Sequence, residues 1–301
     1  MNKEYPKQIT IGITAFNCGV YLYDAIRSVL DQNTDQWLGI LILDGGADNQ
    51  TKQIFHEFEN PKFQKHFFIK NQGPFGTRSK AIEISKTKWY FQLDGDDILP
   101  PNAVSDILKT INKNPEAEFI YGDCEIFSKN TQMVEKPIND DEILCTRPIY
   151  NPVSPITVSL FNQIGGFAKG MYINADWDFW LSIYERKIQG AYTNSIIYSC
   201  RRRRNNVGYK FMSLRPKIIE TIISRHPIFF NNNKRKNKAR YNVFNKLARY
   251  NRALGKRNEA ANYVRKAIEY GEFTDTFSSI LLEEKMSWFR YLIRRIGRLI
   301  Y

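Results

Sequence analysis

Three carboxylates stand within four positions of one another in the segment WYFQLDGDDILPP, residues 89–101. An aromatic and apolar run, typical of a strand entering a core, leads directly to Asp94, Asp96 and Asp97. Carboxylates gathered in this way repel one another unless a cation lies between them. Mg²⁺ and Mn²⁺ prefer oxygen ligands and often bind one or two carboxylates together with substrate phosphates. The segment therefore predicts a divalent-metal site, with Asp96 and Asp94 as ligands, that serves a phosphorylated substrate.

The same three acids also have a local explanation. Asp97 would then cap a following helix, and the other two would be solvated turn residues. Gly95 favours a site, because a glycine lets a ligand approach the backbone closely. The acids at i and i+2 on either side of it can reach the same region. The surrounding elements have to decide between these readings.

Strand and helix patterns alternate over the first 130 residues. Strands are expected at 9–16, 40–44, 67–71, 89–93 and 118–127, and helices at 21–30 and 77–85. Such alternation is typical of an α/β fold whose mostly parallel sheet has helices on both faces. Ligands bind such sheets beyond the carboxyl ends of the strands. Phe16, Asn17, Asp44 and Asp94 all fall there.

The remaining chain changes character twice. Residues 139–175 are expected to be loop-rich, and an aromatic helix at 175–187 and a strand at 192–200 follow. The run RRRRNN starts at residue 201, and from about residue 214 the pattern is helical. We therefore predict one domain over 1–210, with halves meeting near residue 130, and a helical extension over 211–301.

Composition narrows the class of protein. Of the 301 residues 43% are apolar, which suffices for a sizeable core, and no run is long enough to span a bilayer. Four scattered cysteines without CxxC spacing and only three histidines argue against a structural zinc site. The start of the chain has no signal-peptide pattern. These features predict a reduced, cytoplasmic setting.

The net charge of +13 is concentrated in the extension. Residues 1–200 carry 19 Lys and Arg against 24 Asp and Glu, whereas residues 201–301 carry 25 against 7. Phosphorylated ligands, acidic lipid head groups and nucleic acid are the anionic partners that such a segment can meet.

Two patterns stand out in the extension. Residues 241–271 resemble a single tetratricopeptide unit, which must pack on the larger domain or on a partner because one unit cannot bury its own face. The last helix, from residue 283, has an apolar face opposite three arginines. It suits either an anionic membrane surface or packing within the fold or a homo-oligomer.

Five stretches, in order, resemble motifs of the family 2 glycosyltransferases, inverting nucleotide-sugar enzymes with the GT-A fold. They are ITIGITAFNCGVYLYDAIRSVLDQ, LILDGGADNQT, GTRSKAIEISKTKWYFQLDGDDILPP, IGGFAKG and NADWDFWLS. The resemblance covers about residues 7–210. Ser79 and Ala81 depart from it, standing where the family usually has Asn and Gly.

The resemblance implies roles for individual residues. The donor nucleotide would be bound by residues of the first strand and its turn, by the acid that reads the base, and by the arginine motif and the acidic strand end: Thr14, Phe16, Asn17, Asp44, Arg78, Asp94, Gly95 and Asp96. The residue matching the catalytic base is Asp176, with Asp178 as its rival two positions on. Arg201 and Arg203 fall where family members carry residues that meet the diphosphate.

Several of these positions have local alternatives. Asp44 is also a natural turn acid before two glycines, Asp176 a natural helix N-cap, and Arg78 a solvated helix residue. The chemistry is nevertheless coherent. A metal at Asp96, with Asp94 acting through ribose or water, would stabilise the leaving diphosphate, and Asp176 would accept the proton of the acceptor hydroxyl.

We therefore predict an inverting, Mn²⁺- or Mg²⁺-dependent glycosyltransferase. Its donor would be a nucleoside diphosphate sugar, with UDP expected from the family, and its acceptor a hydroxyl group of a glycan or lipid-linked glycan. Cell-surface polysaccharide or glycolipid assembly would suit this activity, with peripheral membrane association and no nucleic acid bound. Two alternatives stay open: a nucleotidyltransferase, and a basic scaffold or nucleic-acid-binding protein with a degenerate transferase domain.

Overall fold

The computed structural model describes residues 8–137, 140–148, 153–202 and 211–271, with a few positions between 277 and 285. The chain divides into two compact units, one from residues 1–140 and 148–205 and the other from 141–147 and 206–301. Arg203 and Arg204, and all but two residues of the predicted terminal helix, lie outside the described residues.

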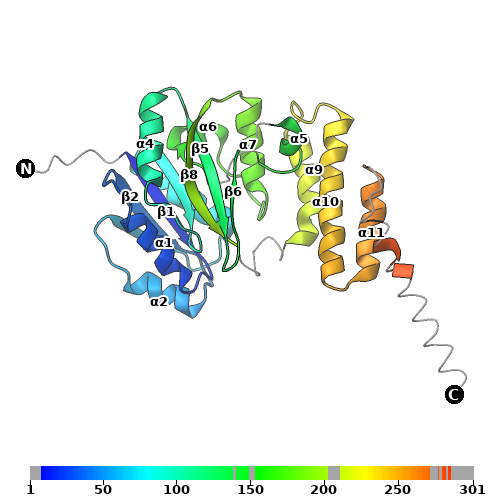
Figure 1. Ribbon diagram of the computed structural model, residues 1–301, viewed down its shortest axis with the longest axis horizontal. Helices are drawn as coiled ribbons and strands as arrows, with labels where there is room; N and C mark the ends of the chain where they lie inside the picture. Colours follow the sequence, from blue (N-terminus) through cyan, green and yellow to red (C-terminus); the bar gives the residue numbers. More distant parts are fainter. Residues whose placement is uncertain are drawn as a thin grey trace, which may run out of the picture. The chain divides into compact units, whose positions relative to one another are not determined.

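The first unit contains one eight-stranded sheet and its covering helices (Figure 1). In chain order its elements are β1 (Ile9–Ala15), α1 (Tyr21–Leu30), β2 (Trp37–Leu43), α2 (Asn49–Glu57), β3 (Phe63–Phe67), α3 (Gly73–Glu83), β4 (Trp89–Asp94), α4 (Ala103–Lys113), β5 (Phe119–Phe127), β6 (Gln132–Glu135), β7 (Ile156–Thr157), α6 (Val158–Ile164), α7 (Ala175–Glu185) and β8 (Gly190–Arg201).

The sheet is mixed with a parallel core. Its order is β3-β2-β1-β4-β7-β5-β6, and β8 pairs with β5. Neighbours from β3 to β4 are parallel, as are β5 and β8, whereas β7 runs antiparallel between β4 and β5. The predicted α/β class with a mostly parallel sheet is confirmed. Consequently β1, β2 and β4 place their carboxyl ends at one edge.

Helices cover both faces of this sheet (Figure 1). On one face α1, α2 and α4 pack on the strands around Ile11, Leu41 and Phe91, which are all fully buried. On the other face α3, α6 and α7 pack around Ile42, Tyr90 and the aromatic residues of α7. Burial from both sides explains why the central strands read as continuous apolar runs.

Two sequence predictions of local structure were wrong. The strand expected at 67–71 is β3 at Phe63–Phe67, because Phe63 contacts Trp37 and Phe58 while Ile69 is 88% exposed. The helix expected to start at Thr77 starts at Gly73, with a proline in its first two positions, where proline is well tolerated. The stretch at 139–175 is loop-rich as expected, with the short elements α5 (Asp141–Leu144), β7 and α6 within it.

The second unit is helical. It contains α5, η1 (Met212–Leu214), α9 (Arg215–Arg225), α10 (Asn233–Ala253) and α11 (Arg257–Ile268). Small and apolar side chains join α10 to α11, and Phe277 and Ile280 complete that cluster. Asp141 and Glu142 of α5 form ion pairs with the start of α10. Among the described residues no helix combines the length and the apolar character needed to cross a membrane.

Candidate active site

Asp94 ends β4 at the carboxyl edge of the sheet and forms an ion pair with Arg78 of α3. Arg78 Nη2 donates to both carboxylate oxygens, at 2.7 and 2.6 Å. Burial disfavours the charged guanidinium, but the charge and hydrogen bonds of Asp94, together with the charges of Asp176 and Tyr198, outweigh that effect and raise the pKa of Arg78. Arg78 is therefore a buried cation at the strand edge and not the solvated helix residue that the sequence also allowed.

Hydrogen bonds through Gln92 also orient Asp94. Gln92 Nε2 donates to Thr14 Oγ1 at 2.9 Å and to Asp94 Oδ1 at 3.2 Å. The Tyr90 hydroxyl in turn donates to Gln92 Oε1 at 2.6 Å. These contacts join the ends of β1 and β4, so Thr14 and Asp94 lie in one connected polar network.

Gly95 is enclosed by the protein's own atoms. Its N–H donates to the carbonyl of Thr14 at 2.9 Å. A Cβ at this position would lie 2.8 Å from Cys18 Sγ and 2.9 Å from the Thr14 carbonyl oxygen. Atoms of β1 and of the turn that follows it therefore leave no room for a side chain at position 95. The fold alone accounts for the glycine.

Asp97 turns inward and joins the acidic turn to β8. It accepts hydrogen bonds from the Tyr198 hydroxyl at 2.8 Å and from the Arg201 N–H at 2.6 Å, and Tyr198 Oη accepts from the Asp94 N–H at 3.1 Å. Burial, followed by the charges of Asp94 and Asp96, raises the pKa of Asp97 to about 7. Asp97 does not cap α4, whose N-cap residue is Asn102.

The Arg201 side chain extends along the outer side of the same turn. Its Nε donates to the Asp96 carbonyl at 2.9 Å, and its Nη2 pairs with Asp24 of α1 at 2.8 Å. The guanidinium also lies over the rings of Tyr21 and Phe127, 4.4 and 4.8 Å from their centroids. Arg201 therefore binds the backbone of the acidic turn to α1, while the Asp96 side chain is half-exposed.

Asp176 reaches the same region from a distant part of the chain. It lies in the first turn of α7, and both Arg78 and Asp94 act on it electrostatically. Burial raises the pKa of Asp176, whereas the Arg78 charge and the N–H groups of Trp177 and Asp176 itself oppose that rise. Asp178, in contrast, is 1% exposed and packs inside the unit.

Asp44 directly follows β2, the neighbour of β1 in the sheet, and is held by backbone groups. Its carboxylate accepts from the N–H groups of Gly45 at 2.8 Å, Gln72 at 2.7 Å and Gly73 at 3.1 Å. Burial raises its pKa against these hydrogen bonds. Because Gln72 and Gly73 begin α3, Asp44 fixes the start of the helix that carries Arg78.

The turn after β1 borders this edge. Phe16 packs partly against the core, and Asn17 adopts a left-handed conformation with φ of 52°. Asn17 Oδ1 accepts a hydrogen bond from the Asp48 N–H at 2.8 Å, and Asn17 is exposed to solvent. This turn is therefore accessible from solvent at Asn17.

Sequence reasoning missed three residues that position the others: Gln92, Tyr198 and Asp24. Each lies within a predicted strand or helix, and only its long-range partner reveals its role. No three His, Cys, Asp or Glu side chains gather as a metal site in the described part of the chain. Asp96 offers a half-exposed carboxylate two positions from Asp94, which fits a cation that takes most of its oxygen ligands from phosphate and water.

Comparison with known proteins matches residues 10–158 to the model of the family described as Glycosyl transferase family 2. Chondroitin synthase of Escherichia coli is 25% identical over 182 residues, which cover 59% of this chain. The chain spans 26% of that relative and less than half the length of the other curated relatives considered.

Two solved structures share the fold. One is S. aureus TarS 1–349 in complex with UDP-GlcNAc, with a TM-score of 0.59, 13% identity and coverage of 93% of this chain and 92% of that one. The other is the mannosyltransferase PcManGT from Pyrobaculum calidifontis in complex with GDP-Man and Mn²⁺, with a TM-score of 0.55, 12% identity and coverage of 94% and 80%. At this level of identity the likeness establishes the GT-A fold alone.

Proposed function

This chain belongs to glycosyl transferase family 2, and from that premise we propose that it transfers a sugar from a nucleoside diphosphate sugar to a hydroxyl group of an acceptor. The observation that carries the proposal is the convergence of Asp94, Arg78 and Asp176 at one end of the sheet. These residues come from three elements that are far apart in the sequence, β4, α3 and α7, so local structure does not bring them together. The family premise also disfavours a nucleotidyltransferase and a non-catalytic scaffold.

The donor nucleotide in this proposal lies across the ends of β1, β2 and β4. Thr14, Phe16 and Asn17 would border it on one side and Gly95 and Asp94 on another. Asp44 would hydrogen-bond the base through its carboxylate, which also accepts from three backbone N–H groups. Uracil is the proposed base, in keeping with the UDP-GlcNAc bound by TarS.

Asp96 is the residue proposed to bind Mn²⁺ or Mg²⁺ directly, because Arg78 already contacts both oxygens of Asp94. Asp94 would then act through ribose or water. The cation would supply positive charge to the leaving diphosphate. The Mn²⁺ in the PcManGT complex supports this choice of metal. Arg201, at the Asp96 carbonyl, would hold the turn in position, and the proposal for Arg203 as a diphosphate contact rests on sequence alone.

Asp176 is the proposed general base. Burial raises the pKa of Asp176, and a base whose pKa approaches the working pH accepts a proton more effectively in the transition state. Attack by the deprotonating hydroxyl on the face opposite the diphosphate inverts the anomeric carbon. Asp178 is too deeply buried to serve as an alternative, at 1% exposed.

The acceptor is proposed to be a glycan or a lipid-linked glycan in the assembly of a cell-surface polysaccharide or glycolipid. The similarity to a chondroitin synthase supports a polysaccharide. Peripheral association of a cytoplasmic enzyme with an anionic membrane surface stays part of the proposal, resting on the basic extension. If the full-length chain and a chain truncated after Thr276 bind anionic vesicles equally well, that part is wrong.

The test is thermal shift of the purified chain with UDP or GDP, each with and without Mn²⁺. We expect stabilisation by UDP that increases when Mn²⁺ is added, because ligand that binds only the folded state raises the melting temperature. A screen of nucleotide sugars for nucleotide release then identifies the donor. If no nucleoside diphosphate stabilises the chain in a metal-dependent way, the proposed function fails.

A further inference from the structure

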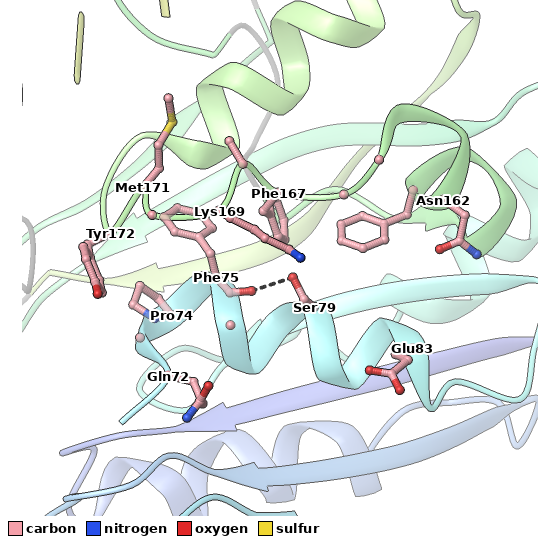
Figure 2. Close-up of a pocket in the computed structure, with 17 residues that line it drawn as sticks. Gln72, Pro74, Phe75, Ser79, Glu83, Asn162, Phe167, Lys169, Met171 and Tyr172 are labelled. Atoms are coloured by element: carbon pink, nitrogen blue, oxygen red, sulfur yellow. Dashed lines mark hydrogen bonds between the residues drawn. The ribbon is translucent and has the colours of Figure 1, made fainter. Parts of the chain in front are cut away.

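A groove of about 540 Å³ lies in the first unit between α3 and the turn that joins α6 to α7 (Figure 2). Its size is that of a pocket for a small organic ligand. Figure 2 shows Tyr172 and Met171 with Pro74 and Gln72 at one end, and Asn162 and Glu83 at the other. The groove is therefore elongated along α3.

One end of this groove adjoins the candidate active site. Phe75 lines the groove, and the Arg78 guanidinium lies over its ring, 5.4 Å from the centroid. Gly73 lines it too and donates its N–H to Asp44. The opposite wall ends at Tyr172, four residues before Asp176. A molecule in the groove would thus extend toward the residues proposed to carry the reaction.

The walls of the groove combine aromatic rings with backbone. Phe75 and Phe167 pack with their centroids 5.1 Å apart, and Tyr172 is 52% exposed. Flat rings beside the backbone of a glycine-rich turn offer both apolar contact and hydrogen-bonding groups. This combination suits a saccharide ring, which has apolar faces and a rim of hydroxyl groups.

Lys169 gives the groove a positive charge. Figure 2 shows its side chain extending across the groove toward Ser79 of α3. Within the described part of the chain no carboxylate pairs with Lys169, and Glu83, the acid that lines the groove, pairs with Lys80 at 2.8 Å. Ser79 donates its hydroxyl to the Phe75 carbonyl of its own helix at 2.8 Å and, as a neutral group, leaves the charge of the lysine uncompensated.

We propose that this groove binds the acceptor and that Lys169 recognises a carboxylate or phosphate group on it. The inference rests on the proposed function and adds the chemical class of the acceptor, an anionic saccharide. The groove supplies contact for the sugar ring. The Lys169 ammonium group, which pairs with no carboxylate of the described residues, selects for the anion. Charge-assisted hydrogen bonds of this kind discriminate strongly against neutral analogues.

The test uses an array of saccharides that carry uronate groups, phosphate groups or no charge. The full chain is applied with UDP and Mn²⁺, and bound protein is measured. We expect wild type to bind anionic saccharides at least roughly tenfold better than their neutral counterparts, as expected for one charge-assisted contact. Lys169→Met should remove this preference and Lys169→Arg should retain it. The uronate and phosphate members show which anion is the natural one.

Two further variants separate charge from space. Lys113→Met removes an exposed lysine from the last turn of α4, on the other face of the sheet, and should leave binding unchanged. Ser79→Trp fills the groove and should weaken binding of every saccharide while leaving the thermal shift with UDP and Mn²⁺ intact. That shift is the check on the proposed function itself.

The outcomes are distinct. Absence of any UDP shift in wild type would contradict the proposed function, and this inference would fall with it. A normal UDP shift with no saccharide bound, or with equal binding of charged and neutral saccharides, would overturn the inference alone. Equal binding by wild type and Lys169→Met would also overturn it.

Discussion

Arg78 Nη2 bonds both oxygens of Asp94, at 2.7 and 2.6 Å, and so joins the third helix of the chain to the acidic strand end. The Arg78 side chain is 11% exposed and that of Asp94 is 32% exposed. An ion pair this well shielded is sensitive to the loss of one partner, because the other is left uncompensated.

Arg78→Ala should therefore lower the free energy of unfolding by about 2–3 kcal/mol, below the full cost of a completely buried pair because Asp94 keeps some solvent. The change is measured by urea denaturation. Arg27→Ala is the matched control, since Arg27 and Asp31 form an ion pair with side chains 82% and 60% exposed. That variant should be indistinguishable from wild type. Equal effects of the two substitutions would show that the Arg78–Asp94 pair is not the buried contact described.

Asp176→Asn should abolish sugar transfer while nucleotide binding stays nearly intact. Removal of a general base costs roughly 10²- to 10⁴-fold in rate. Within the described residues Asp176 makes no hydrogen bond to the donor-binding strands that its loss would disturb. Transfer is measured as product formation and binding as the thermal shift with UDP and Mn²⁺. Loss of both activities together would mean that the base has been assigned to the wrong residue.

The pH dependence of transfer should report the same carboxylate. Burial raises the pKa of Asp176 and the positive charge of Arg78 lowers it. Only the ionised form accepts a proton, so kcat falls as the pH falls through the raised pKa. Arg78→Met removes the charge that lowers this pKa, and the acid limb should move to higher pH. Arg78→Lys keeps the charge and should leave the limb near its wild-type position. A limb that does not move in Arg78→Met would assign it to another group.

The sequence predicts which strand ends carry the site but not which side chains meet there. Asp44 and Asp94 follow apolar runs, and parallel topology alone brings the ends of β2 and β4 to one edge. The partners of Asp97 are more than 100 positions away on β8, where Tyr198 looks like an ordinary strand residue and Arg201 begins a basic run. Such pairings depend on the register of β8 against β5, including its irregularity near Asp123, which has no local signal.

The same limit explains why the contacts of Arg201 in the structure differ from the predicted one. Its place at the start of a run of four arginines predicts contact with a diphosphate, and the structure pairs it with Asp24 and the Asp96 carbonyl. The acid that binds it lies on α1, 177 positions earlier. Neither spacing nor composition links the two.

Arg201→Ala should weaken metal binding more than nucleotide binding. The side chain holds the backbone of Asp96, the proposed metal ligand, so its loss leaves that carboxylate less well placed. We expect the Mn²⁺ concentration that gives half-maximal transfer to rise roughly tenfold, as for loss of a residue that orients a ligand. Arg201→Lys should restore part of this loss, and Arg202→Ala, at a neighbouring exposed residue, should cause none. An unchanged Mn²⁺ dependence in Arg201→Ala would refute this role.

Gly95→Ala tests whether the acidic turn needs space or conformational freedom. Its Cβ would lie 2.8 Å from Cys18 Sγ, 2.9 Å from the Thr14 carbonyl and 3.2 Å from Leu22. Because one of these neighbours is backbone, the turn must shift, and overpacking of this kind costs about 1–3 kcal/mol.

Gly46→Ala is the contrasting variant, since Gly46 has φ of 76° and nothing within 4 Å of an added Cβ. It should cost about 1 kcal/mol from strain alone and leave transfer intact, whereas Gly95→Ala should also reduce transfer by displacing Asp94 and Asp96. Adding Cys18→Ala to Gly95→Ala should recover only part of the stability, because the Thr14 carbonyl still blocks the methyl group. Full recovery in the double variant, measured by urea denaturation, would show that the cysteine alone sets the need for glycine.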